Sequence, residues 1–223
     1  MRSFYAQEGK CDMELKNKTV NFIGDSITAG VGASCTENRY TDVFARLFGA
    51  KVNNYGISAT RIARQSVVTE GFRDRDFCMR FTEMDETADA VVVFGGTNDF
   101  GHGDAPLGTM QDRTPATFYG ACHYLMSGLL ERYCGKPVVI LTPLHRTEED
   151  EPNVNGVTLK RYREILMEVA AYYALPVLDL YATSGIQPRH AACCEKLMPD
   201  GLHPSDEGHA IIARRVGLFL SQL

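Results

Sequence analysis

Short apolar runs, each followed by a loop and then by a longer amphipathic stretch, recur along the chain. The run at 90–94 is continuous and rich in β-branched valine, as expected for a strand that is covered on both faces. Strands that alternate with helices pair in parallel, because each helix carries the chain back across the sheet before the next strand begins. The pattern predicts strands at 19–23, 52–55, 90–94, 137–141 and 176–180.

Longer segments with apolar residues at helical spacing follow these runs. They predict helices at 40–48, 115–133, 159–173 and 205–220. Thr114 and Ser205 are the expected N-caps of the second and fourth helices, and Pro115 suits a first helical position. A length of 223 residues fits one domain, which we expect at 18–223 after an N-terminal extension at 1–17.

Charge and cysteine content weigh against several classes of function. The net charge of −5 gives no electrostatic reason to expect nucleic acid or a membrane surface as a partner. The N-terminal segment has no continuous apolar stretch of the signal-peptide type, and no run approaches the roughly 18 apolar residues of a membrane span. The seven cysteines are scattered without a C-x-x-C pair, which favours reduced thiols and a cytoplasmic location.

Four polar motifs follow predicted strands, where parallel α/β sheets collect their functional residues. They are GDS at 24–26, NYG at 54–56, GGTND at 95–99 and DGLHP at 200–204. Each has a simpler explanation when taken alone, because glycine makes turns and Asp and Ser cap helices. Their value as evidence therefore lies in the combination.

In this order, and each at a strand end, the motifs resemble those of the SGNH hydrolases, also called the GDSL esterase/lipase family. The resemblance extends from about residue 20 to residue 203. It implies that Ser26 is the nucleophile, His203 the general base and Asp200 the residue that orients the base. It further implies an oxyanion hole that includes Gly56 and Asn98.

The chemistry of these side chains points the same way. A serine hydroxyl needs a base to take its proton, and histidine has a suitable pKa near neutrality. A carboxylate orients that imidazole, and Asp200 can reach His203 through a tight turn. The backbone amides of Ser26 and Gly56 and the side-chain amide of Asn98 are candidate donors to a tetrahedral intermediate.

The expected fold is a three-layer α/β/α sandwich around a five-stranded parallel sheet with flavodoxin-like strand order, the SGNH hydrolase fold. The expected function is ester hydrolysis through an acyl-serine intermediate, without a cofactor or metal. Polar loops at 95–113 and 144–156 favour a small-molecule or glycan partner that carries short acyl groups such as O-acetyl. A lysophospholipase or acyl-thioesterase and a non-catalytic binding protein are the alternatives, and the oligomeric state is left open.

Other folds and sites fit the sequence less well. An α/β-hydrolase needs a G-x-S-x-G elbow, and a nucleotide-binding module needs a G-x-G-x-x-G or P-loop motif; none occurs here. A metal could use Asp200, His203, Asp206 and His209, but a capped helix terminus with Asp206 and His209 on the helix surface is simpler.

Several charged and histidine side chains outside the proposed catalytic residues have candidate roles. Asp25 and His102 are candidate substrate-binding residues, although an exposed loop histidine is an equal interpretation of His102, and His123 is expected to be structural. The segment at 61–86 holds five arginines and six acidic residues, which favours a solvated helical surface over an anion site. The arginines are Arg61, Arg64, Arg73, Arg75 and Arg80.

Overall fold

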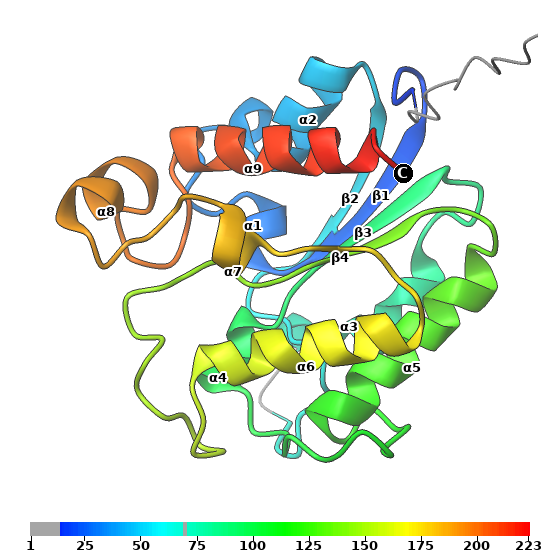
Figure 1. The fold of residues 1–223 in the computed structure, drawn as a ribbon, viewed down its shortest axis with the longest axis vertical. Helices are drawn as coiled ribbons and strands as arrows, with labels where there is room; N and C mark the ends of the chain where they lie inside the picture. The colour runs from blue at the N-terminus through cyan, green and yellow to red at the C-terminus, as the bar shows by residue number, and fades with distance from the viewer. Residues whose placement is uncertain (1–13, 69–70) are drawn as a thin grey trace, which may run out of the picture.

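A computed structural model describes residues 14–68 and 71–223, and a five-stranded parallel sheet lies at its centre (Figure 1). The strands are β1 (Thr19–Gly24), β2 (Lys51–Gly56), β3 (Ala90–Phe94), β4 (Val138–Leu141) and β5 (Val177–Leu178). Their spatial order, β2-β1-β3-β4-β5, is the flavodoxin-like order. The predicted α/β class, parallel sheet and strand order are confirmed.

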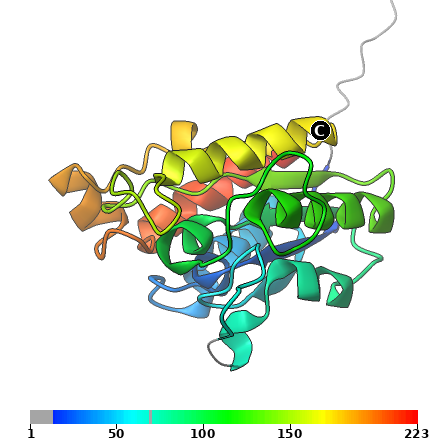
Figure 2. The same cartoon turned by 90° about the horizontal axis from the view of Figure 1, so that it is seen from below.

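Helices cover both faces of the sheet, which gives the predicted three layers. Figure 1 shows α2 and α9 on one face and α3, α5 and α6 on the other, and Figure 2 shows α5 and α6 lying side by side. The helices are α1 (Ser26–Ala29), α2 (Tyr40–Phe48), α3 (Phe77–Arg80), α4 (Thr97–His102), α5 (Phe118–Arg132), α6 (Leu159–Tyr172), α7 (Leu180–Thr183), α8 (Ala191–Leu197) and α9 (Asp206–Leu220). Short 3₁₀ turns occupy Thr36–Asn38, Gly71–Asp74 and Phe81–Glu83.

The apolar run of β3 is divided between two hydrophobic cores. Val91 and Val93 pack in the core beneath α5 and α6, whereas Ala90, Val92 and Phe94 pack in the core beneath α2 and α9. Successive strand side chains point to opposite faces, so a central strand needs apolar residues at every position when helices cover both sides. All five residues of β3 are accordingly buried.

Two predicted elements differ from the observed bounds by more than one residue. Helix α5 begins at Phe118 because the hydroxyl oxygen of Thr117, not that of Thr114, accepts from the Gly120 amide. Strand β5 ends early because the Asp179 side chain caps the next helix. Ser205 caps α9 as predicted, accepting from Gly208.

The predicted N-terminal extension is only partly described. Residues 1–13 lie outside the described residues, but Leu15 is buried in the core and the Asn17 amide donates to the Gly49 carbonyl. Packing of the domain thus includes residues before position 18. Within the described ranges, the helices are too short or too polar to cross a bilayer.

Candidate active site

The register of the sheet brings the ends of β1, β2 and β3 together. Gly24 pairs with Gly56 on one side and with Phe94 on the other. The chain leaves β1 at Gly24 and enters α1 directly, and the Asp25 carboxylate caps that helix by accepting from the Ile27 amide at 3.0 Å. Ser26 is therefore the first residue of a short helix at the carboxyl edge of the sheet.

Ser26, His203 and Asp200 form a continuous hydrogen-bonded chain. Ser26 Oγ lies 3.0 Å from His203 Nε2, and His203 Nδ1 lies 2.6 Å from Asp200 Oδ2. The other oxygen, Asp200 Oδ1, accepts from the backbone amides of Leu202 and His203 at 2.9 and 2.6 Å. Ser26 lies more than 170 positions from Asp200 and His203 in the sequence, and the fold brings the three residues together.

The environment of Asp200 suits an orienting carboxylate. Partial burial raises the pKa of Asp200, but the hydrogen bonds from the backbone and ring of His203 outweigh it and lower the pKa below its usual value. An ionised Asp200 accepts from Nδ1–H, which leaves the Nε2 lone pair for the hydroxyl of Ser26. The arrangement has the base and nucleophile geometry of a serine hydrolase.

Two glycines allow neighbouring loops to approach the 200–204 turn closely. Gly201 has a φ of 74°, and an added Cβ would lie 2.5 Å from Thr147 Oγ1, while the Thr147 amide donates to the Gly201 carbonyl. Gly32 has a φ of 92°, and an added Cβ would lie 2.2 Å from the Pro204 carbonyl oxygen. These contacts hold the turn from both sides and so position the His203 ring.

The prediction that His209 lies on the helix surface is wrong. His209 is fully buried, its Nε2 donates to the Val31 carbonyl, and its Nδ1 accepts from the Tyr40 amide. Burial lowers the pKa of His209, in agreement with a neutral ring that donates at one nitrogen and accepts at the other. Because both nitrogens are engaged, His209 is not placed to share a metal with Asp200.

Asp206 likewise makes specific contacts at the start of α9. Its carboxylate accepts from the amide and hydroxyl of Ser34 at 2.8 and 2.6 Å and from Asn38 Nδ2 at 2.9 Å. The helix that follows His203 is therefore tied to the loop that follows the Ser26 helix. Within the described ranges, no group of three His, Cys, Asp or Glu side chains could hold a metal ion.

The predicted oxyanion donors differ in availability. The Ser26 amide lies at the first position of α1. Asn98 Nδ2 donates one hydrogen to the Thr60 carbonyl at 3.0 Å, and its second hydrogen has no partner among the described residues. The Gly56 amide instead donates to Asn54 Oδ1 at 2.8 Å, so it would have to exchange this partner to serve an oxyanion. Ala59 follows with an amide that has no partner among the described residues and a left-handed φ of 64°.

Gly56 has a clear packing reason to be glycine. A Cβ there would lie 2.3 Å from the Ala29 backbone nitrogen, so the strand end packs directly against α1. Neither Ala59 nor its conformation was singled out in the sequence, because alanine gives no signal of a positive φ.

Asp25 is nearly enclosed, with 2% of its surface exposed, which does not favour the predicted contact with substrate. Burial raises the pKa of Asp25 to about 7, and the nearby Asp99 adds to the effect. Asp99 is also buried, with its pKa raised to about 6, and accepts from the amides of Ile62 and Ala63. Both carboxylates thus stabilise backbone turns around the site.

The raised pKa of Asp25 predicts a pH-dependent stability. The contribution of this carboxyl is fully present below its unfolded pKa near 3.8 and is lost as the pH rises through about 7, because the folded chain disfavours the charged form. Asp25→Asn keeps an acceptor for Ile27 and removes this titration. Between pH 4 and pH 8, the free energy of unfolding of the variant should rise relative to wild type by on the order of 3 kcal/mol. Urea unfolding at both pH values measures this, and parallel profiles would contradict it.

His102 lies one helical turn after Asn98 on α4. Its Nδ1 is 3.0 Å from Arg61 Nη1, and Arg61 in turn pairs with Asp74 at 3.0 Å. Because arginine only donates, Nδ1 accepts and Nε2 carries the ring hydrogen. Burial and the Arg61 charge lower the pKa of His102, so a neutral donor is presented beside Asn98. A contact with substrate stays a prediction.

The predicted solvated helical surface at 61–86 is wrong for two of its arginines. Arg61 and Arg80 are buried, and the described part of the segment forms loops and short helical turns instead of a solvated helical surface. The balance of five arginines against six acidic residues did not reveal that these two arginines are buried. Each is held by backbone carbonyls or by a residue distant in sequence, and such contacts do not show in a charge count. His123 is buried against Tyr173, as expected for a structural residue.

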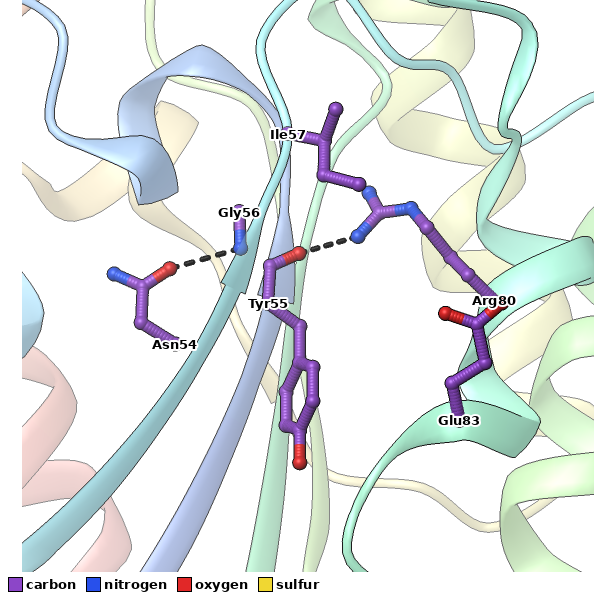
Figure 3. Close-up of a pocket in the computed structure, with 6 residues that line it drawn as sticks. All are labelled: Asn54, Tyr55, Gly56, Ile57, Arg80 and Glu83. Carbon is purple, nitrogen blue, oxygen red and sulfur yellow. Dashed lines mark hydrogen bonds between the residues drawn. The ribbon is translucent and has the colours of Figure 1, made fainter. Parts of the chain in front are cut away.

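The described part of the chain forms recesses that differ in volume and in the residues that line them. One of about 260 Å³ lies between α4 and the loop after β4, and it is lined by Phe100, Gly101, Arg146, Glu148, Glu151 and Asn153. Another of about 420 Å³ is lined by Arg64, Gln65, Val68, Asp74 and Met79. A third of about 210 Å³ lies at the end of β2 (Figure 3), lined by Asn54, Tyr55, Gly56, Ile57, Arg80 and Glu83.

Solved structures with the same fold include proteins of substantial sequence identity. One is 35% identical with a TM-score of 0.85, covering 94% of this chain and 99% of the other. A protein from Lactobacillus plantarum is 31% identical with a TM-score of 0.80, covering 92% and 97%. A carbohydrate acetylesterase family member from Sinorhizobium meliloti is 19% identical with a TM-score of 0.60, covering 91% and 97%, and shares the fold.

Among curated protein sequences, none matches this chain. The model of the GDSL-like lipase/acylhydrolase family matches residues 22–211, which include all four motifs. The chain therefore belongs to the GDSL-like lipase/acylhydrolase (SGNH) family of carboxylic ester hydrolases.

Proposed function

We propose that this chain is a serine esterase that hydrolyses short acyl esters, such as O-acetyl groups, on a carbohydrate or another polar carrier. The observation that carries the catalytic part is the hydrogen-bonded chain from Ser26 through His203 to Asp200, with steps of 3.0 and 2.6 Å. These distances lie within the reach required for proton transfer between a nucleophile and its base.

The proposed reaction has two halves. His203 Nε2 takes the Ser26 proton as Oγ attacks the ester carbonyl, Asp200 stabilises the imidazolium, and His203 then protonates the leaving alcohol. In the second half His203 removes a proton from water, which attacks the acyl-serine, and His203 then gives that proton to the departing Ser26 Oγ as the acid is released. The Ser26 amide and Asn98 Nδ2 donate to the oxyanion in both halves, and no cofactor is required.

Support for a polar carrier comes from the recess of about 260 Å³ beside α4, which is the helix that carries Asn98. Arg146 and Glu148 supply donors and acceptors there, as hydroxyl groups of a sugar require. The Sinorhizobium meliloti protein that shares the fold is described as a carbohydrate acetylesterase family member, which is compatible with this proposal.

A specific feature favours the alternative, a lysophospholipase or acyl-thioesterase. The recess of about 420 Å³ includes Val68 and Met79, and the neighbouring Val67 and Phe72 are also exposed. Asp104 holds this loop against the end of α4 by accepting from the amides of Ser66 and Val67. An acyl chain of eight or more carbons would need an apolar surface of this kind.

A chain-length series of p-nitrophenyl esters separates the two. We expect kcat/KM to be highest for acetate and to fall by about 10-fold or more beyond butyrate, because a short acyl pocket excludes added methylenes. Preference for octanoate or longer esters would favour the alternative. Met79→Ser should then lower the rate on long esters and leave the acetate rate unchanged. Release of acetate from acetylated sugars tests the carrier.

We further propose a cytoplasmic location and an ester-bearing small molecule or glycan as the partner. Both rest on the charge, the cysteine pattern and the polar loops of the sequence.

A further inference from the structure

Arg80, the last residue of α3, is a buried cation outside the catalytic chain, with 3% of its surface exposed. Figure 3 shows its side chain reaching across the recess at the end of β2 toward the Tyr55 carbonyl, to which Nη1 donates. Its Nη2 donates to the Gly24 carbonyl at 2.7 Å and to Thr60 Oγ1 at 3.0 Å. The planar fork of the guanidinium thus binds three acceptors from three segments.

Each acceptor belongs to a segment that carries or contacts a predicted catalytic group. Gly24 ends β1 immediately before Asp25 and Ser26. Tyr55 precedes Gly56 at the end of β2. Thr60 closes the loop after β2, and its carbonyl accepts from Asn98 Nδ2.

The loop between Tyr55 and Thr60 also depends on this contact. The Thr60 hydroxyl donates to the Ile57 carbonyl at 2.7 Å and the Thr60 amide donates to the same oxygen at 3.3 Å, which closes the turn that contains Ala59. Ala59 has the left-handed φ noted above, a conformation that persists only where its surroundings enforce it. Arg80 supplies part of that enforcement through Thr60.

We propose that Arg80 is a positioning residue for ester hydrolysis, which holds the end of β1 and the 57–60 loop so that the Ser26 amide and the Asn98 side chain are aligned as donors to the oxyanion. This inference rests on the proposed function of Ser26 and Asn98. Donors to an oxyanion act through their placement, and a displacement of about 1 Å can reduce the rate by about 100-fold. Without the guanidinium, three buried oxygens would lose a donor and the segments would shift.

Arg80 keeps its charge at neutral pH. Burial lowers the pKa of the guanidinium to about 10, and the nearby Asp25 carboxyl partly offsets this effect. The Phe77 ring lies 4.6 Å below the guanidinium and Nε donates to the Arg75 carbonyl, so the side chain has a single well-supported position.

Arg80→Lys tests the inference, because lysine keeps the charge but lacks the fork that reaches three acceptors. We expect kcat for p-nitrophenyl acetate to fall by about 10- to 100-fold while KM changes by less than about 2-fold. Arg132→Lys is the matched control, since Arg132 also donates to a backbone carbonyl, that of Met84, outside the site. Its kcat should stay within about 2-fold of wild type.

Two further readouts separate positioning from a purely structural role. The rate of inactivation by a fluorophosphonate, whose adduct places an oxygen in the oxyanion hole, should fall in parallel with kcat/KM. The apparent pKa in the pH profile of kcat/KM should not move, because Arg80 does not contact His203 or Asp200. A lowered melting temperature with an unchanged kcat would overturn the inference.

Thr60→Val provides a second route if Arg80→Lys does not fold. It keeps the side-chain volume and removes the hydroxyl that Arg80 binds, so kcat should fall by about 5-fold. If Arg80→Lys folds and hydrolyses the ester at the wild-type rate, this inference alone is overturned. If Arg80→Lys does not fold, a wild-type rate in Thr60→Val overturns it in the same way. Hydrolysis that persists in Ser26→Ala would overturn the proposed function and this inference with it.

Discussion

Replacing Ser26 by alanine is expected to lower kcat for p-nitrophenyl acetate by about 10⁵- to 10⁶-fold, because the change removes the oxygen that is placed beside the base to form the acyl-enzyme. The side chain of Ser26 bonds to His203 and makes no other hydrogen bond among the described residues. The fold should therefore survive, with a melting temperature close to that of wild type. Initial rates together with thermal unfolding of the same preparation measure both.

A serine outside the site provides the control for this prediction. Ser127 on α5 donates to the His123 carbonyl of the same helix at 2.8 Å. Ser127→Ala should keep the wild-type rate. Full activity in folded Ser26→Ala protein would remove Ser26 from the mechanism.

Asp200→Asn is expected to lower kcat by about 10⁴-fold, a smaller loss than that of either Ser26→Ala or His203→Ala. The asparagine amide can donate to Nδ1 and so favours the tautomer that places a hydrogen on Nε2, where the serine proton must be accepted. It also removes the negative charge that stabilises the imidazolium. Steady-state kinetics of the three variants on one substrate gives the ranking.

The half-buried Asp42 on α2 offers a comparison for this series, since it pairs with Arg39 at 2.8 Å. Asp42→Asn should leave kcat unchanged. An Asp200→Asn variant that keeps more than about a tenth of the wild-type kcat would show that the 2.6 Å contact with His203 does not orient the base.

The fold was predictable because local patterns and global packing agree in this chain. The unbroken apolar run of β3 reflects its burial between two cores, and the Ser205 cap marks the true start of α9. The start of α5 was not predictable from the sequence, because Thr114 and Thr117 are both acceptable N-caps by residue type. The choice between them depends on tertiary contacts, since Asp112 accepts from the Thr117 hydroxyl and so orients that cap.

The catalytic chain was predictable for a different reason. The Ser26 motif follows β1 directly, at the edge where parallel strands bring their carboxyl ends together, and the motif with Asp200 and His203 forms the turn before α9. The supporting residues gave no comparable signal. Arg80 meets Gly24 across 56 residues, and His209 meets Val31 across 178, so neither contact leaves a local pattern.

Labelling with a fluorophosphonate probe tests most directly whether Ser26 is the nucleophile. The active wild-type protein is treated with the probe, its intact mass is measured, and the modified peptide is mapped. The account predicts one adduct per chain on Ser26, absent from Ser26→Ala and greatly slowed in His203→Ala. An unlabelled wild-type protein that still hydrolyses esters, or an adduct on another residue, would contradict it.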